Sequence, residues 1–506
     1  MRVTSSEQSR RADVRHAAKG GGTNLLAVIA GLALPAYHAV VARFFGKALY
    51  GAYSVAVGLL EIVARFAMLG MDKGVLRHIA AHRAVGEDDL LRRTLSTAFW
   101  ATAATGAALA ALMALLAAPL AALQENPSIV RPLRLLAPSA PFTALIAVLI
   151  SATMAAKVMR FNLYVRGLGQ PLLLMAAAII ASHFSRSLLA LCASHLIATA
   201  ITAVWAFVVT ARVFDQGSFW QQLRQGPPHW EMVRFSMPMG LSEALNGVLQ
   251  RADLIILSFY ADESVVGVYA AAELLSRSVS NARYAFDPVA SPVLSEALAQ
   301  GDRARLSYNL KLMTRWVLLL TFPVVAFIVG FRVELLSLFG KGFSSGAAAF
   351  LILVLGHVFN CSLGLVGWVL GMAGRSDLIL LNNALSAALN IAVCLFTVPR
   401  FGLIGAALAS AVSVAFYQLL QLLLVVRLQR VQPFSSLGLR LVAIGSATIC
   451  LMYFVAPRLP ENLVMRLVVG TVIMLTAYGA AVLLFGLGRE ERQAIDKWRN
   501  RRNQDR

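Results

Sequence analysis

The feature of this chain that most constrains its fold is a succession of apolar runs, each about 20 residues long, separated by charged or turn-forming residues. A helix needs about 20 residues to cross the hydrocarbon core of a bilayer. Only 14% of the residues are charged and 58% are hydrophobic, whereas soluble domains have about 25% charged residues. A soluble globular fold is therefore excluded, and we predict an all-α polytopic membrane protein with about 14 transmembrane helices. The predicted spans are 23–42, 51–71, 94–118, 135–156, 168–184, 188–211, 236–259, 265–288, 312–331, 346–372, 378–398, 402–426, 437–457 and 465–487.

The basic residues lie mostly on one side of these predicted spans. With the N-terminus placed in the cytoplasm, the cytoplasmic segments hold 30 of the 45 Lys and Arg residues and the segments on the other side hold ten. This bias follows the positive-inside rule, and it accounts for the net charge of +20 without a nucleic-acid partner. We therefore predict that both termini are cytoplasmic.

A weak internal repeat divides the chain into two lobes. No loop between spans is long enough to fold separately, so the function is expected inside the helical bundle. Five residues recur 216 positions later, with the pair Gly51 and Tyr53 matching Gly267 and Tyr269. The repeat predicts two pseudo-symmetric six-helix lobes plus two C-terminal helices. The predicted parts are a tail at 1–22, an N-lobe at 23–211, a linker at 212–235, a C-lobe at 236–426, two further helices at 437–487 and a basic cytoplasmic tail at 488–506.

Four segments resemble the polysaccharide-transporter family, the lipid-linked oligosaccharide flippases of bacterial O-antigen and exopolysaccharide pathways. They are residues 42–80, 234–253, 266–275 and 398–410. The resemblance implies a fold shared with lipid II flippases and multidrug antiporters, a bacterial inner-membrane location and transport rather than enzymatic catalysis. It also implies alternating access for a polyprenyl-diphosphate-linked oligosaccharide, carried from the cytoplasmic to the periplasmic leaflet. The implied partners are this lipid-linked oligosaccharide, the bilayer, and polysaccharide polymerase and chain-length machinery; we expect a monomer without a cofactor.

Charged residues within the predicted spans are the candidate functional residues, because each costs about 2.5 to 3.5 kcal/mol near the centre of a membrane helix. They must pair or line water. We expect Glu61 to face Arg65, and Glu273 to face Arg277, because each pair is four residues apart on a helix. We predict that Glu61 and Arg277 line one aqueous cavity between the lobes. The remaining charged residues in these spans are Glu243, Arg251, Asp253 and Arg283.

Arginine can hold phosphate oxygens with paired hydrogen bonds, so the arginines are the candidate contacts for a diphosphate. The predicted phosphate contacts are Arg65, Arg251, Arg277 and Arg283. We expect Glu61, Asp253 and Glu273 to orient these arginines or to bind a coupling cation. The alternative is that these residues form structural ion pairs, and the surroundings of Asp253 are also compatible with a role in stability.

No metal site is predicted. His78 and His82 are four residues apart, which is a possible metal spacing on a helix, but they lie in a basic segment without a nearby cysteine. We expect them to form a solvated helix face. The four cysteines, at 192, 361, 394 and 450, lie in apolar runs and are expected to be buried.

Three other functions remain open at this level. A cation-coupled multidrug antiporter is disfavoured by the number of spans and by the lack of a carboxylate in span 23–42. A lipid II flippase is disfavoured because its typical first-helix arginine is missing. A non-transporting membrane scaffold of a glycan assembly complex is disfavoured by charges within spans of both lobes.

Overall fold

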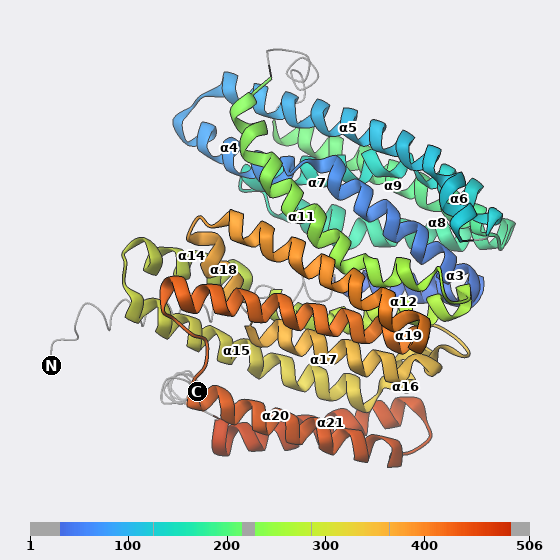
Figure 1. Ribbon diagram of the computed structural model, residues 1–506, viewed down its shortest axis with the longest axis vertical. Coiled ribbons are helices and arrows are strands. Elements are labelled where there is room, and N and C mark those ends of the chain that lie inside the picture. Colours follow the sequence, from blue (N-terminus) through green and yellow to red (C-terminus); the bar gives the residue numbers. More distant parts are fainter. Residues whose placement is uncertain (1–30, 125, 215–227, 285, 364, 487–506) are drawn as a thin grey trace, which may run out of the picture.

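The computed structural model describes residues 31–124, 126–214, 228–284, 286–363 and 365–486. The predicted tails at 1–22 and 488–506, the first residues of span 23–42 and most of the linker at 212–235 lie outside these ranges. The described residues form helices and no strand (Figure 1). The prediction of an all-α protein is confirmed.

The helices follow the order of the predicted spans. In the N-lobe they are α3 (Ala33–Met68), α4 (Met71–Val85), α5 (Asp88–Leu123), α6 (Val130–Leu136), α7 (Ser139–Ala155), α8 (Gln170–Phe184) and α9 (Leu188–Val213). The C-lobe contains α11 (Trp230–Leu257), α12 (Glu263–Arg277), α13 (Asn281–Tyr284), α14 (Asp287–Ala299), α15 (Arg303–Gly330), α16 (Arg332–Ser337), α17 (Ala347–Leu363), α18 (Val366–Met372) and α19 (Ser376–Gln429). The chain ends with α20 (Ser436–Val455) and α21 (Leu463–Ala481).

Ten helical segments of the described chain are long and apolar enough to cross a bilayer. Two of them, 33–85 and 377–429, have 53 residues each. Each contains a break at a glycine, Gly46 with φ 81° and Gly402 with φ 53° and ψ −127°. The first break lies between the predicted spans 23–42 and 51–71, and the second lies at the start of the predicted span 402–426. The more polar α11 and α12–α14 occupy the positions of the predicted spans 236–259 and 265–288. Together these segments account for the fourteen predicted spans.

The segment after α7 starts the next helix. Residues Asn162–Gly169 form a π-helical turn that leads directly into α8, and Lys157 has a left-handed φ of 65° between the two helices. The fifth span therefore begins a few residues earlier than the predicted residue 168.

The N-lobe helices and most C-lobe helices form two groups, with α11 running obliquely between them (Figure 1). Helix α11 contacts α3 and α4 of the N-lobe as well as α19 of the C-lobe. Helices α20 and α21 lie along one edge and pack against α15. The residues between the two groups are therefore carried by α3, α11 and α12.

The outer faces carry apolar side chains at helical spacing. On α21, Val464, Val468, Val472 and Leu475 are more than half exposed, as expected for a face in contact with lipid. Three cysteines are buried, but Cys450 on α20 is exposed, so the expected burial is wrong for this residue. Cys450 lies two residues before the buried Met452, and two residues turn about 200° around a helix, which places it on the opposite side.

The lobes contact each other through two glycines related by the 216-residue repeat. A Cβ atom on Gly51 of α3 would lie 1.9 Å from the carbonyl oxygen of Glu263. A Cβ atom on Gly267 of α12 would lie 2.1 Å from the carbonyl oxygen of Lys47. Lys47 and Glu263 are also 216 positions apart. Each glycine therefore contacts the residue that corresponds, in the other lobe, to the contact of its counterpart, as around a two-fold axis. The lobe contact follows the predicted repeat.

Candidate functional site

An ion pair joins the second half of α3 to α11. Arg251 donates from Nε to Glu61 at 2.8 Å and from Nη2 to the same carboxylate at 3.0 Å. The guanidinium and the carboxylate are thus paired in the parallel, two-bond geometry that makes such contacts strong. A Cβ added at Gly58, one turn before Glu61, would lie 3.7 Å from Arg251 Cδ, an ordinary contact, so the ion pair does not require a glycine there. The bidentate pair links residues that are 190 positions apart in the chain.

Glu273 extends this pair into α12. Arg251 Nη1 donates to Glu273 Oε2 at 3.2 Å, and Arg277 Nη2 donates to Glu273 Oε1. Arg277 Nη2 also donates to the backbone carbonyl of Gln250 at 2.8 Å. We call Glu61, Arg251, Glu273 and Arg277 the charge network. It contains two cations and two anions, and the predicted pairing of Glu273 with Arg277 is confirmed.

The members of the charge network differ in exposure. The Glu273 side chain is 5% exposed, that of Arg251 is 18% exposed and that of Glu61 is 37% exposed. Glu273 is therefore the buried centre, whereas Glu61 is the accessible end on the N-lobe side. A carboxylate this accessible within a predicted span must face either lipid or water, and its cost in lipid favours water.

Arg65 also reaches α11 rather than its expected partner Glu61. Its Nη1 lies 4.0 Å from Glu243 Oε2, and its Nη2 donates to Gln250 Oε1 at 3.4 Å. Gly247 makes this possible, because a Cβ at that position would lie 2.4 Å from Arg65 Cδ. The expected pairing of Glu61 with Arg65 is wrong: α11 supplies partners for both residues, which four-residue spacing on α3 cannot reveal.

Asp253 is buried beside the charge network but has its own partners. Its carboxylate accepts a hydrogen bond of 2.5 Å from the Tyr269 hydroxyl and one of 2.8 Å from the Leu254 amide. At the positions 216 residues earlier, the hydroxyls of Tyr37 and Tyr53 are hydrogen-bonded to each other. The same helix contact is therefore made by two tyrosines in the N-lobe and by an aspartate and a tyrosine in the C-lobe. Asp253 was a predicted site residue, but its hydrogen bond to Tyr269 and the equivalent contact between Tyr37 and Tyr53 were not predicted, although the 216-residue repeat relates them.

Arg283 lies outside the charge network. It belongs to α13, and its guanidinium carbon lies 4.7 Å from the ring centre of Tyr284. The structure thus brings together three of the predicted phosphate contacts around α11, namely Arg65, Arg251 and Arg277, and places the fourth on a separate helix.

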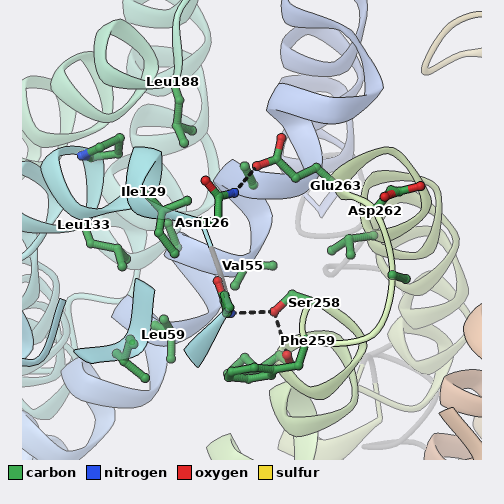
Figure 2. A pocket seen from close by; sticks show the side chains of 18 residues that line it. Val55, Leu59, Asn126, Ile129, Leu133, Leu188, Ser258, Phe259, Asp262 and Glu263 are labelled. Carbon is green, nitrogen blue, oxygen red and sulfur yellow. Dashed lines mark hydrogen bonds between the residues drawn. The ribbon is translucent and has the colours of Figure 1, made fainter. Parts of the chain in front are cut away.

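A cavity of about 230 Å³ lies between the lobes, and residues of α3, α6, α11 and α12 line it. Figure 2 shows two hydrogen bonds across it: Asn126 donates to Glu263 at 2.8 Å and Gln124 donates to Ser258 at 2.9 Å. Leu59 of α3 lines the cavity, whereas Glu61, two residues later, lies about 200° around the helix from it. Ile255 lines it four residues, or about one turn, after Arg251.

None of the eight charged residues that were predicted within the spans lines this cavity itself. The common aqueous cavity around Glu61 and Arg277 therefore stays a prediction. The cavity and the charge network thus involve different residues of α3 and α11, and the polar cross-lobe contacts of Gln124 and Asn126 precede α6.

The family described as "Polysaccharide biosynthesis protein" matches residues 40–345 of this chain. An uncharacterized membrane protein of Methanocaldococcus jannaschii is 21% identical over 296 residues. That match takes in 58% of this chain and 57% of the relative, so the chain spans a little over half of the length of this relative.

Solved structures with a similar fold are transporters. The lipid II flippase MurJ in an inward closed conformation has a TM-score of 0.71 and 14% identity, covering 91% of this chain and 98% of MurJ. An inward-facing multidrug resistance MATE family transporter has a TM-score of 0.65 and 14% identity over 82% of this chain and 98% of its own. The MATE transporter VcmN of Vibrio cholerae has a TM-score of 0.60 and 16% identity, and the match covers 84% of this chain and 98% of VcmN. At these identities the similarity shows a shared fold.

Proposed function

The chain belongs to the polysaccharide biosynthesis protein family, and we propose that it is a flippase for a polyprenyl-diphosphate-linked oligosaccharide. It would carry this lipid from the cytoplasmic to the periplasmic leaflet of a bacterial inner membrane by alternating access. The product would serve O-antigen or exopolysaccharide assembly.

One observation carries the proposal: ionised side chains from both lobes meet in a single network within the spans. Glu61 comes from the N-lobe, and Arg251, Glu273 and Arg277 come from the C-lobe. Because isolated charges in hydrocarbon are costly, an arrangement of four within spans by default indicates a functional site. A diphosphate is the part of the substrate that most needs such a site, since the prenyl chain can remain in lipid.

We propose that the diphosphate competes with the carboxylates for the arginines. Glu61 takes the Nε and Nη2 donors of Arg251 and Glu273 takes one donor of Nη1, so a phosphate that binds Arg251 through its Nε and Nη2 edge must replace Glu61. Glu61 is the accessible acceptor, at 37% exposure against 5% for Glu273. Replacement of Glu61 would release α3 from α11, which would couple substrate binding to a change in the lobe contact.

Asp253 has a different proposed role. It is 1% exposed and its two oxygens accept hydrogen bonds from Tyr269 and Leu254, so it holds α11 against α12 rather than contacting phosphate.

A cation-coupled antiporter is the second candidate function. The fold shared with MATE transporters favours it, and a buried carboxylate such as Asp253 is the group that would bind a coupling cation.

The test uses a strain without its own copy of the gene, complemented with variants of equal membrane abundance. The readouts are surface polysaccharide and lipid-linked oligosaccharide retained on the cytoplasmic side. Glu61→Arg combined with Arg251→Glu restores an ion pair with the charges exchanged. We expect this double variant to remain inactive, because it moves the guanidinium from α11 to α3. Export at the native level would show that the pair is only structural.

Arg375→Gln is the matched control, because Arg375 is paired with Asp377 at an exposed helix start. It should leave export unchanged. Export that persists in the deletion strain, together with altered drug tolerance, would favour the antiporter. Export lost on deletion but retained in every variant of the charge network would favour a scaffold.

A further inference from the structure

Three histidines from distant parts of the sequence converge next to α4. His78 and His82 lie on α4, and His229 immediately precedes α11. One nitrogen of each lies within 4.8 Å of the others. The ring centres are 5.9 Å apart for His78 and His82, 5.1 Å for His78 and His229, and 5.5 Å for His82 and His229. Figure 1 shows α4 and the start of α11 close together at the α5 side of the molecule.

This arrangement differs from the solvated helix face that the sequence suggested. His78 is only 8% exposed, so that expectation is wrong for this residue. The His82 side chain is 12% exposed. The Nε2 atoms of both His78 and His82 are buried and have no hydrogen-bond partner. A buried imidazole nitrogen without a partner is costly, which indicates that a group absent from the protein itself completes the site.

The other nitrogens of two of these rings are held in place. His82 Nδ1 lies 2.9 Å from Glu87 Oε2, and His229 Nδ1 lies 3.1 Å from Thr94 Oγ1. The backbone amide of His229 also donates to Thr97 Oγ1 at 2.9 Å. A carboxylate or hydroxyl on the far nitrogen fixes the orientation of a metal-binding histidine and leaves its second nitrogen free to bind.

We propose that His78, His82 and His229 bind one zinc ion, or a similar first-row transition metal ion, with Glu87 and Thr94 orienting the ligands. Nitrogen ligands at about 2.0 to 2.1 Å in tetrahedral geometry lie about 3.3 Å from one another. The present separation of up to 4.8 Å means that the ligand nitrogens must approach one another by up to about 1.5 Å when the ion binds. Three protein ligands leave a fourth position for water.

The site would join parts that belong to different lobes. His78 and His82 are carried by the N-lobe, whereas His229 is at the first turn of α11, which carries Arg251 and Asp253 at its other end. A bound metal would therefore fasten the start of α11 to α4 and α5. This inference does not depend on the proposed substrate.

The test measures metal binding by the full-length protein, purified in detergent with an affinity tag that contains no histidine. Co²⁺ serves as the spectroscopic probe and Zn²⁺ as its competitor. We expect one Co²⁺ per chain, with the visible absorption of a four-coordinate ion, and its displacement by Zn²⁺. His229→Ala and His82→Ala should each abolish this binding. Glu87→Gln should weaken it by about 10- to 100-fold, as for other outer-shell changes.

His183→Ala is the control, since His183 is exposed on α8 and away from the cluster, and it should bind Co²⁺ like the native protein. His82 is more accessible than His78, so His82→Ala and His229→Ala remain informative where His78→Ala fails to fold. The proposal would be overturned by native protein that takes up no stoichiometric Co²⁺, or by binding that survives His229→Ala unchanged.

Discussion

The reciprocal glycine contact gives the sharpest stability prediction. A methyl group added at Gly51 would place its carbon 1.9 Å from the carbonyl oxygen of Glu263 and 2.7 Å from the amide nitrogen of Gly267. Ordinary contacts between carbon and carbonyl oxygen are about 3.3 to 3.6 Å. The two atoms must therefore separate by about 1.4 Å or more. Both neighbouring atoms belong to the backbone, so no side-chain rotation can provide this space and α3 must move away from α12.

We expect Gly51→Ala to destabilise the protein by about 1 to 3 kcal/mol or more, since overpacking typically costs this much. Gly267→Ala should have a similar effect, because its Cβ would lie 2.1 Å from the carbonyl oxygen of Lys47. The double variant should cost less than the sum of the two, since the movement that accommodates one methyl group also makes room for the other.

The assay is the thermal unfolding midpoint of purified protein in detergent at one fixed scan rate. Gly479→Ala on α21 is the matched control, because a Cβ there would meet no atom within 4 Å. Alanine favours the helix by about 1 kcal/mol over glycine, so the control should unfold at the same or a higher temperature. If Gly51→Ala unfolded like this control, the close approach of α3 and α12 would be refuted.

Three further predictions concern other parts of the molecule. Asp253→Ala should lower the stability by about 1 to 3 kcal/mol for each buried donor left without an acceptor. The loss of stability should be smaller in the double variant with Tyr269→Phe, which removes the donor hydroxyl, and the same unfolding assay measures both. Gly402→Ala should lower the unfolding midpoint by an amount equivalent to about 1 to 3 kcal/mol, because alanine is strained at φ 53° and ψ −127°; a midpoint equal to that of Gly479→Ala would contradict this. A thiol-specific cross-linker joining Asn126→Cys to Glu263→Cys should block glycan export until it is cleaved, and export by the cross-linked protein would argue against opening of the lobes at this end.

The sequence predicted those features that depend on local spacing. Apolar runs located the spans, and the i, i+4 rule predicted the pairing of Glu273 with Arg277 on one helix. The 216-residue offset predicted that Gly51 and Gly267 are equivalent, although the direct contact between them became visible only in the structure.

Features that depend on packing between distant helices could not be predicted in this way. Glu61 binds Arg251 instead of Arg65 because α11 crosses α3 at that level, and this crossing leaves no trace in the spacing along α3. The same reason applies to His229, which lies 147 positions after His82 and joins the histidine pair only through the packing of α11 on α4. Cys450 was mispredicted because an apolar run shows membrane insertion but not which side of a helix faces lipid.

The equal numbers of acidic and basic residues in the charge network have a consequence for energetics under membrane voltage. In the alternating-access cycle that we propose, the return of the unloaded protein moves no net charge of this network through the electric field, so we expect this step to be insensitive to voltage. A diphosphate moving outward carries negative charge, and a potential that is negative inside favours that movement by about 2.3 kcal/mol for each charge per 100 mV. The loaded half of the cycle would then draw on the potential directly, and uncouplers should slow delivery of glycan without slowing the resetting of the empty protein.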